Sequence, residues 1–215
     1  MAGSGDPLAR PITILAIPGS LRAASLNRMV VDSLQGLAPD GMRVKVYLGA
    51  GDLPLYNEDF DTATPPAQVQ ALRAEIAAAD GLFWAMPEFN HTIPSVVKNL
   101  IEWVSHPVSD ALLVGKISAI AVATQGRGGY RGMADLSRVL RDLGGHVVVA
   151  PEVCIHFAHT CISRDEAGHV QYRDPLTERL LRMLLEYLTR AARNDVGVHT
   201  AAPWRAIFAR TEAPG

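Results

Sequence analysis

Short apolar runs, rich in β-branched residues, alternate with segments of helical periodicity along most of this chain. The runs cover residues 12–17, 44–48, 81–86, 117–124 and 147–150. Their length and continuous apolar character are typical of strands buried on both faces of a sheet. Because helical segments separate them, such strands pair in parallel through right-handed crossovers. The sequence therefore predicts an α/β fold, a three-layer sandwich around a five-stranded parallel sheet.

The segments between the runs carry apolar residues three and four positions apart, as in Val69, Leu72 and Ile76. This spacing is typical of helices that bury one face. Capping and breaking residues mark the helix boundaries. The boundary residues are Ser25, Pro65 and Pro66, Pro94, Gly144 and Gly145, and Asp174 with Pro175.

The length of 215 residues fits a single domain with tails. We expect a flexible N-terminal tail at 1–11, one domain at 12–192, and a C-terminal tail or packing arm at 193–215. The formal net charge of −2 and the lack of a basic stripe disfavour nucleic acid as a partner. No apolar run is long enough to span a membrane, no signal-like segment is visible, and only two cysteines occur. We therefore expect a cytoplasmic protein without a membrane partner.

The loop after the first strand combines anion-binding features. Ser20, Ser25 and Asn27 can donate hydrogen bonds, Arg22 carries a full charge, and a helix begins at this point. Free amides and a positive dipole end make such a helix start suitable for a phosphate monoester. An ordinary capped turn is the alternative. The loop has neither the Walker pattern nor the G-x-G-x-x-G fingerprint, and it holds no cysteine nucleophile.

Two further loops follow the third and fourth strands, at residues 87–94 and 124–132. Parallel strands bring all three loops to one edge of the sheet, where ligands of open α/β sheets bind. The glycines of the third loop allow close backbone approach, and Phe89 offers an apolar wall. Together the loops suit a planar ring attached to a phosphate. Taken singly, the glycine-rich stretch could be a surface turn and Phe89 a core aromatic.

Four motifs in order carry a family resemblance: GSLRAASLN at 19–27, DLPLYNEDF at 52–60, PEFNHTIPSVVKNLIEW at 87–103 and GRGGYRG at 126–132. With them the chain resembles the NADPH-dependent FMN reductase family of flavodoxin-like proteins, which includes quinone, chromate and azo-dye reductases. The resemblance implies a flavodoxin-like sheet of order 2-1-3-4-5. It also implies an oxidoreductase that passes a hydride from NADPH through bound FMN to a quinone, flavin, azo compound or chromate.

The resemblance further implies a set of FMN-binding residues, with the phosphate at the first loop and the ring between the other two. This set is Ser20, Arg22, Ser25, Leu26, Asn27, Pro87, Glu88, Phe89, Asn90, Gln125, Gly126, Gly128 and Gly129. His91 and Tyr130 are expected on the substrate side, although His91 could equally be a solvated loop histidine. No residue is expected to act as a catalytic acid or base, because the flavin carries the chemistry. Segment 52–60 and the helix that follows Pro94 are implied to make subunit contacts in a homodimer or homotetramer.

Two alternatives remain open from the sequence. A flavodoxin-type electron carrier or a flavin-binding regulatory module would use the same fold without turnover of a pyridine nucleotide. Cys154, His156, His159 and Cys161 are possible metal ligands, but their spacing matches no standard zinc pattern, and we expect no metal. Arg127 and Arg131 are compatible with a 2′-phosphate, which leaves the choice between NADPH and NADH open.

Overall fold

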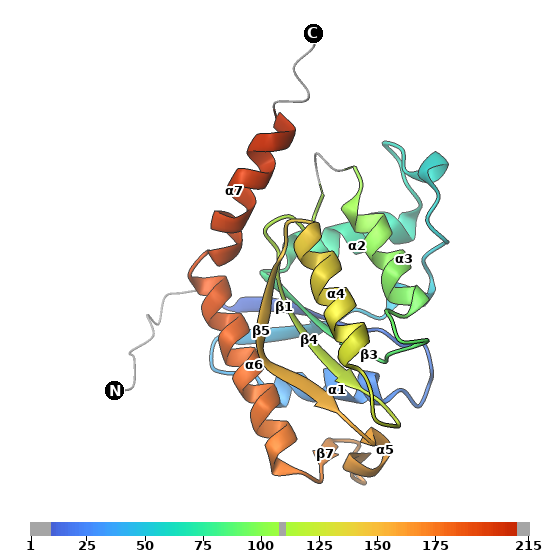
Figure 1. Ribbon diagram of the computed structural model, residues 1–215, viewed down its shortest axis with the longest axis vertical. Coiled ribbons are helices and arrows are strands. Elements are labelled where there is room, and N and C mark those ends of the chain that lie inside the picture. The colour runs from blue at the N-terminus through green and yellow to red at the C-terminus, as the bar shows by residue number, and fades with distance from the viewer. Residues whose placement is uncertain (1–9, 108–110, 210–215) are drawn as a thin grey trace.

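Five parallel strands form the centre of the molecule (Figure 1). The structure is a computed structural model that describes residues 10–107 and 111–209. The strands are β1 (Ile12–Pro18), β2 (Met42–Val46), β3 (Gly81–Met86), β4 (Ile117–Ala123) and β5 (His146–Ile155). Their order is β2-β1-β3-β4-β5, and all four pairings are parallel. This confirms the predicted fold class and strand order.

The strand register places the carboxyl ends of the inner strands together. Pro18 pairs with Ala85, Met86 with Val122, and Ala123 with Ile155. Since each of these pairs lies at or next to the last residue of its strand, the loops that follow β1, β3, β4 and β5 emerge at one edge of the sheet. The strand order also changes direction beside β1, which makes this edge a topological switch point.

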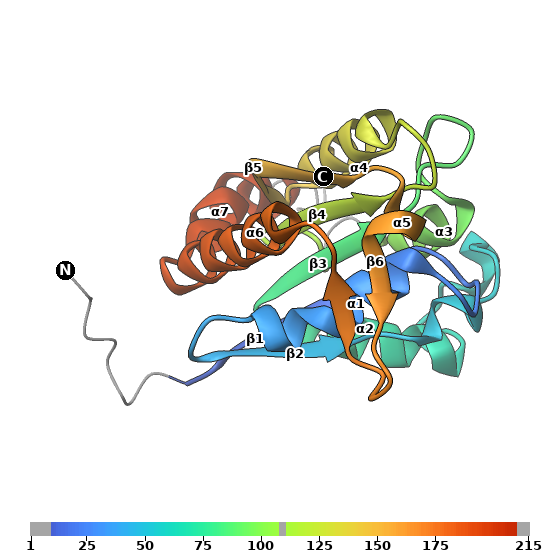
Figure 2. The same cartoon turned by 90° about the horizontal axis from the view of Figure 1, so that it is seen from below.

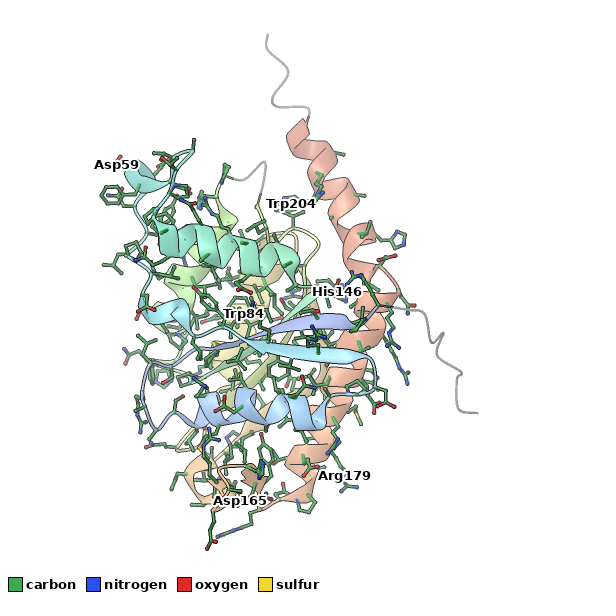
Figure 3. All side chains as sticks on the ribbon, turned by 180° about the vertical axis from the view of Figure 1, so that it is seen from behind. Asp59, Trp84, His146, Asp165, Arg179 and Trp204 are labelled. Atoms are coloured by element: carbon green, nitrogen blue, oxygen red, sulfur yellow. The ribbon has the colours of Figure 1, made fainter. Side chains whose placement is uncertain are left out.

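Helices cover both faces of the sheet, as Figure 2 shows. On one face, α1 (Leu26–Leu37) and α6 (Pro175–Arg193) share a buried cluster with Ile14. On the other face, α2 (Ala67–Ala78), α3 (Ser95–Ser105) and α4 (Tyr130–Asp142) share a second cluster with Leu15 and Trp84. Trp84 lies at the centre of that core (Figure 3), where its indole nitrogen donates to the Ser118 hydroxyl over 3.2 Å. Neighbouring β1 residues thus pack into the cores on opposite faces of the sheet, because successive side chains of a strand point to opposite faces.

The helix boundaries follow the predicted signals. Ser25 caps α1, Asp174 caps α6 with Pro175 at its first turn, and Pro66 and Pro94 directly precede α2 and α3. Helix α4 ends at Asp142, shortly before Gly144, which has a φ of +75°. A glycine takes up this left-handed conformation without the steric cost of a Cβ.

The structure departs from the sequence expectations at several elements. Strand β2 begins and ends two residues earlier than 44–48, and β5 extends five residues beyond 150. The structure adds the short helices η1 (Gly49–Gly51), η2 (Glu58–Phe60) and α5 (Ala158–Cys161), and an antiparallel hairpin of β6 (Ile162–Arg164) and β7 (Val170–Tyr172).

The expected tails are only partly covered by the structure. The segment expected as a C-terminal tail or packing arm contains helix α7 (Val196–Ala209), while residues 210–215 lie outside the described residues. Residues 1–9 of the expected N-terminal tail also lie outside them. Across the described residues, none of the helices combines the length and apolar character of a membrane span.

Candidate functional site

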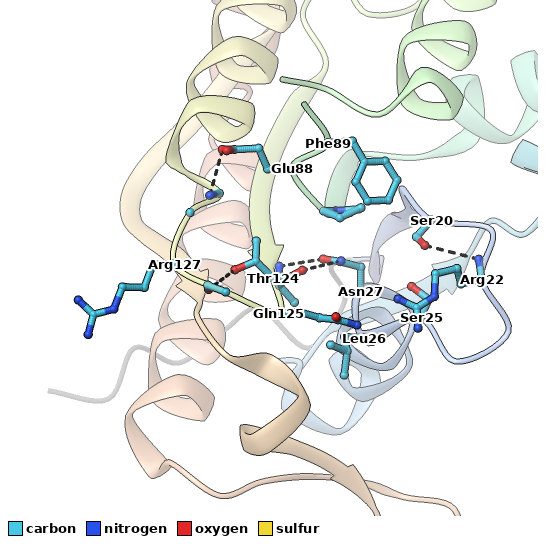
Figure 4. Close-up of a pocket in the computed structure, with 15 residues that line it drawn as sticks. Ser20, Arg22, Ser25, Leu26, Asn27, Glu88, Phe89, Thr124, Gln125 and Arg127 are labelled. Carbon is cyan, nitrogen blue, oxygen red and sulfur yellow. Dashed lines mark hydrogen bonds between the residues drawn. The ribbon is translucent and has the colours of Figure 1, made fainter. Parts of the chain in front are cut away.

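A cavity of about 340 Å³ opens at the carboxyl edge of the sheet (Figure 4). It lies between the loops that follow β1, β3 and β4. Its volume falls within the range of small-molecule sites, about 300 to 1,000 Å³. Its lining residues are Ser20, Arg22, Ser25, Leu26, Asn27, Pro87, Glu88, Phe89, Ala123, Thr124, Gln125, Gly126, Arg127, Gly128 and Gly129.

The N-terminus of α1 forms one end of this cavity. Ser25 is buried, and its hydroxyl oxygen accepts a hydrogen bond from the amide of Arg28 over 3.1 Å. No described residue accepts a hydrogen bond from the amides of Leu26 and Asn27, which are the first two of the helix. Free amides at a helix start attract anions, and the helix dipole adds about 0.3 to 1 kcal/mol. The exposed guanidinium of Arg22 belongs to the same end of the cavity.

The buried side chain of Asn27 joins the first loop to the end of β4. Its amide nitrogen donates to the carbonyl of Ala123 over 2.9 Å, and its oxygen accepts from the amide of Ala123 over 2.9 Å. Asn27 is only 3% exposed, so these bonds are shielded from water. Its carboxamide therefore holds two walls of the cavity together, a role that the sequence did not reveal. One amide proton of the side chain remains available for a ligand.

The loop after β3 makes a tight turn beside the cavity. Phe89 and Thr92 exchange backbone hydrogen bonds of 3.2 and 3.0 Å, and the residues between them, Asn90 and His91, have φ values of 49° and 64°. Two positive φ values in succession are typical of a type I′ turn, and asparagine tolerates this conformation well. The turn leaves Phe89 half exposed on the cavity wall.

Glu88 connects the second loop with the third. One of its carboxylate oxygens accepts from the amides of Gly129 and Gly132, over 3.0 and 2.9 Å (Figure 4 draws the Glu88 contact). It thereby caps α4 from a separate loop, since the residue before that helix, Gly129, provides no side-chain cap. Burial alone would raise the pKa of Glu88, but the amides of Gly132 and Gly129 and the nearby His91 outweigh this and hold the pKa below its ordinary value. Glu88 is thus an ionised helix cap.

The third loop brings backbone atoms to the cavity. Gly129 has a φ of +105°, and a Cβ at this position would lie 2.6 Å from the Cys154 sulfur. Thr124 fixes the start of the loop, because its hydroxyl donates to the carbonyl of Gly126 over 2.9 Å. Only glycine fits at position 129, which explains why backbone atoms and not side chains form this wall of the cavity.

Twelve of the thirteen residues expected to bind FMN line the cavity, and Asn90 does not. His91 and Tyr130 are also absent from its lining. His91 Nδ1 lies 3.5 Å from a carboxylate oxygen of Glu88, and the Tyr130 ring packs on His156 with centroids 5.5 Å apart. Ala123, Thr124 and Arg127 also line the cavity, although they are not among these thirteen residues. The first two end or directly follow β4, so the position of the strand ends could have identified them.

The cysteine and histidine cluster takes part in packing. Cys154 lies within β5 rather than after it, and its sulfur donates to the carbonyl of Gly128 over 3.0 Å. The sulfur of Cys161 lies 3.7 Å from the carbonyl of His156. Within the described part of the chain, no three His, Cys, Asp or Glu side chains are grouped as metal ligands would be.

A second cavity, of about 790 Å³, lies at the opposite edge of the sheet beside α7. Three of its charged groups already have protein partners. Arg10 and Asp80 form an ion pair of 2.5 Å, and the Lys116 ammonium donates to the carbonyl of Ala79 over 2.7 Å. The C-terminal end of α6 also lines this cavity, and that end of a helix carries a partial negative charge. The carboxyl-edge cavity is therefore the better candidate for an anionic ligand.

The strand order, the switch-point cavity and the free helix N-terminus define an α/β protein of the flavodoxin-like class. A solved structure agrees with this: FerB, a flavoenzyme NAD(P)H:(acceptor) oxidoreductase from Paracoccus denitrificans, is 28% identical with a TM-score of 0.76. The match covers 86% of this chain and 98% of FerB. The family model for NADPH-dependent FMN reductase matches residues 12–160. The chain belongs to the NADPH-dependent FMN reductase family.

Relatives in several organisms support this placement. An NAD(P)H-dependent FMN reductase of Pseudomonas aeruginosa is 39% identical over 68% of this chain and 79% of its own length. A quinone reductase of Escherichia coli is 35% identical over 67% of this chain and 78% of its own. A probable NADPH:quinone oxidoreductase of rice is 34% identical over 90% of this chain and 94% of its own. The resemblance inferred from the motifs is confirmed, and with it the assignment to an oxidoreductase family.

Proposed function

We propose that this protein binds FMN in the carboxyl-edge cavity and uses it to pass a hydride from NADPH to a small-molecule acceptor. Quinones, free flavins, azo compounds and chromate are the acceptor classes. Family membership supports the cofactor and the reductant. The observation that carries the proposal is the pair of free amides on Leu26 and Asn27, which lie in the same cavity as Phe89 and the glycine-rich loop.

The first loop suits the phosphate of FMN. The amides of Leu26 and Asn27 and the guanidinium of Arg22 would donate to it. The hydroxyls of Ser20 and Ser25 accept from backbone amides and still have their own protons to donate. Each hydrogen bond to a charged group contributes about 1.5 to 3 kcal/mol, so several converging donors are sufficient for tight binding.

The other two loops suit the ring. Pro87 and Phe89 offer an apolar wall, and the backbone of residues 125–129 offers amides and carbonyls at close range. We assign the thirteen residues expected from the sequence to the FMN site, with Asn27 and Glu88 also organising its loops. Asn90 acts through the tight turn that presents Phe89. His91 and Tyr130 lie outside the lining residues, and we assign them to the acceptor side.

Bound FMN supplies the hydride-accepting ring, so the protein needs no nucleophile of its own. The residues of the cavity would hold the phosphate and the ring of FMN. Backbone amides of residues 125–129 would then be available to stabilise negative charge on the reduced ring. No side chain is assigned as general acid or base.

We also propose that the active form is a homodimer or homotetramer in the cytoplasm. Segment 52–60, where the family resemblance implies subunit contacts, exposes Leu55 and Phe60 by 83% and 56%. Large apolar side chains exposed this far are favourable in a subunit contact and unfavourable in water.

Anaerobic stopped-flow mixing of FMN-loaded protein with NADPH tests the proposal. We expect the visible flavin absorption to bleach and to return when a quinone is added. We also expect ping-pong steady-state kinetics. An electron carrier would hold FMN but show no bleaching by NADPH or NADH. Unchanged absorption with both nucleotides would contradict the reductase function.

A further inference from the structure

Two side chains, Cys154 in β5 and His156 directly after that strand, hold the peptide groups of Gly128 from behind the cavity wall. The Cys154 sulfur donates to the carbonyl of Gly128 over 3.0 Å, and the Gly128 amide donates to Nδ1 of His156 over 3.4 Å. Neither Cys154 nor His156 lines the cavity, whereas Gly128 does. The contacts therefore reach the site only through the backbone of the glycine-rich loop.

Gly129, the next residue along the chain, is held by packing and by a hydrogen bond to a carboxylate. A Cβ on Gly129 would lie 2.6 Å from the Cys154 sulfur and 2.7 Å from Val122, so the backbone rests directly on these side chains. The Gly129 amide donates to the Glu88 carboxylate over 3.0 Å. The peptide group that joins Gly128 and Gly129 is thus held at its oxygen by Cys154 and at its nitrogen by Glu88.

We propose that Cys154 is a positioning residue, which fixes this peptide group so that the loop presents a rigid wall to the flavin ring. The inference rests on the proposed function and adds a residue from outside the cavity. A thiol suits the task, because it is large enough to fill the space under Gly129 and still carries a donor proton.

The surroundings of Cys154 keep that proton in place. Burial, and to a smaller extent the carboxylates of Glu88 and Glu152, raise the pKa of the thiol to about 11. The group therefore stays a protonated hydrogen-bond donor at neutral pH and is a poor nucleophile. This fits a role in positioning and not in covalent chemistry.

Three variants separate positioning from general packing. Cys154→Ala removes the donor, Cys154→Ser keeps a donor of similar size, and Cys161→Ala removes the other free, partly buried cysteine. Two properties are measured for each: hydrogen exchange of the 125–133 segment in the flavin-free protein, and the dissociation constants of FMN and riboflavin.

We expect faster exchange in 125–133 for Cys154→Ala, with exchange elsewhere unchanged. Both flavins should bind about 2- to 10-fold more weakly, the effect of one neutral hydrogen bond. The loss should be equal for FMN and riboflavin, because the ring and not the phosphate meets this wall. Cys154→Ser should restore both properties, and Cys161→Ala should match the parent protein.

Hydrogen exchange in the flavin-free protein tests the positioning role of Cys154 independently of FMN binding. Unchanged exchange in 125–133, or exchange that rises throughout the chain, would overturn the positioning role. Faster exchange confined to this segment supports it. If the parent protein binds no flavin, the proposed function fails, and the exchange result still stands by itself.

Discussion

The carboxamide of Asn27 forms a pair of 2.9 Å hydrogen bonds with the backbone of Ala123, one as donor and one as acceptor. The two residues are 96 positions apart in the chain. Through them the loop after β1 is fixed to the end of β4. The free amides of α1 and the backbone of residues 124–129 therefore keep a constant separation, as a rigid ligand with a phosphate at one end requires.

Asn27→Ala should lower both stability and FMN affinity. It leaves the amide and carbonyl of Ala123 buried without partners, which costs about 2 to 4 kcal/mol in the free energy of unfolding. Asn99→Ala is a matched control, because this buried amide also bridges backbone groups, those of Tyr56 and Pro54, outside the cavity lining. We expect denaturant titration to show a loss for both variants and fluorescence titration to show weaker FMN binding for Asn27→Ala alone. Equal FMN affinity in the two variants would contradict this role of Asn27.

Glu88 should make stability fall in acid. The backbone amides that donate to Glu88 hold its folded-state pKa below the ordinary value. The ionised carboxylate therefore contributes its full share to the free energy of unfolding at any pH above the ordinary pKa. That contribution is lost as the pH falls through the depressed folded-state value. The free energy of unfolding should thus decrease more steeply below about pH 4.5 in the parent protein than in Glu88→Gln. Parallel curves for the two proteins would show that the cap of α4 does not depend on ionised Glu88.

Arg22→Ala should lower the affinity for FMN but not the affinity for riboflavin. The loss of one charged donor should weaken FMN binding about 10-fold and leave riboflavin binding unchanged, since only FMN carries the phosphate. Arg43→Ala, which removes the same charge from an exposed site on β2, is the control. Titrations at two salt concentrations should also show a smaller salt dependence of FMN affinity for Arg22→Ala. A similar loss for riboflavin would place the guanidinium at the ring and not at the phosphate.

Gly129→Ala should lower the free energy of unfolding, whereas Gly126→Ala should not. A methyl group on Gly129 would meet Cys154 and Val122 at 2.6 and 2.7 Å with φ at +105°. Overpacking and backbone strain of this kind cost about 2 to 4 kcal/mol. A methyl group on Gly126, in the same loop, has no neighbour within 4 Å. Thermal unfolding of the two flavin-free variants tests the contrast, and an unchanged unfolding temperature for Gly129→Ala would disprove the close approach.

The fold was predictable from the sequence because its signals are local. Strands 12–17, 81–86 and 117–124 stand out as apolar runs, and Ser25 and Asp174 mark helix starts by their capping side chains. Helix α7 was missed because Pro203 lies inside it, and proline normally ends a helix. Strand β5 was cut short for a similar reason, since Pro151 lies within it.

The residues of the cavity were predictable because they follow strand ends and match family motifs. The structural roles of individual side chains could not be predicted from the sequence. Glu88 caps a helix that begins 42 residues later, Asn27 binds the backbone of Ala123, and Cys154 supports Gly128 from another strand. Such contacts depend on the tertiary arrangement, and neither spacing nor residue type reports them.

A crystal structure of the protein soaked with FMN tests the central claim most directly. We expect the phosphate within hydrogen-bond distance of the Leu26 and Asn27 amides and the ring between Phe89 and the backbone of residues 125–129. A phosphate bound elsewhere, or a cavity without flavin at saturating FMN, would contradict the account.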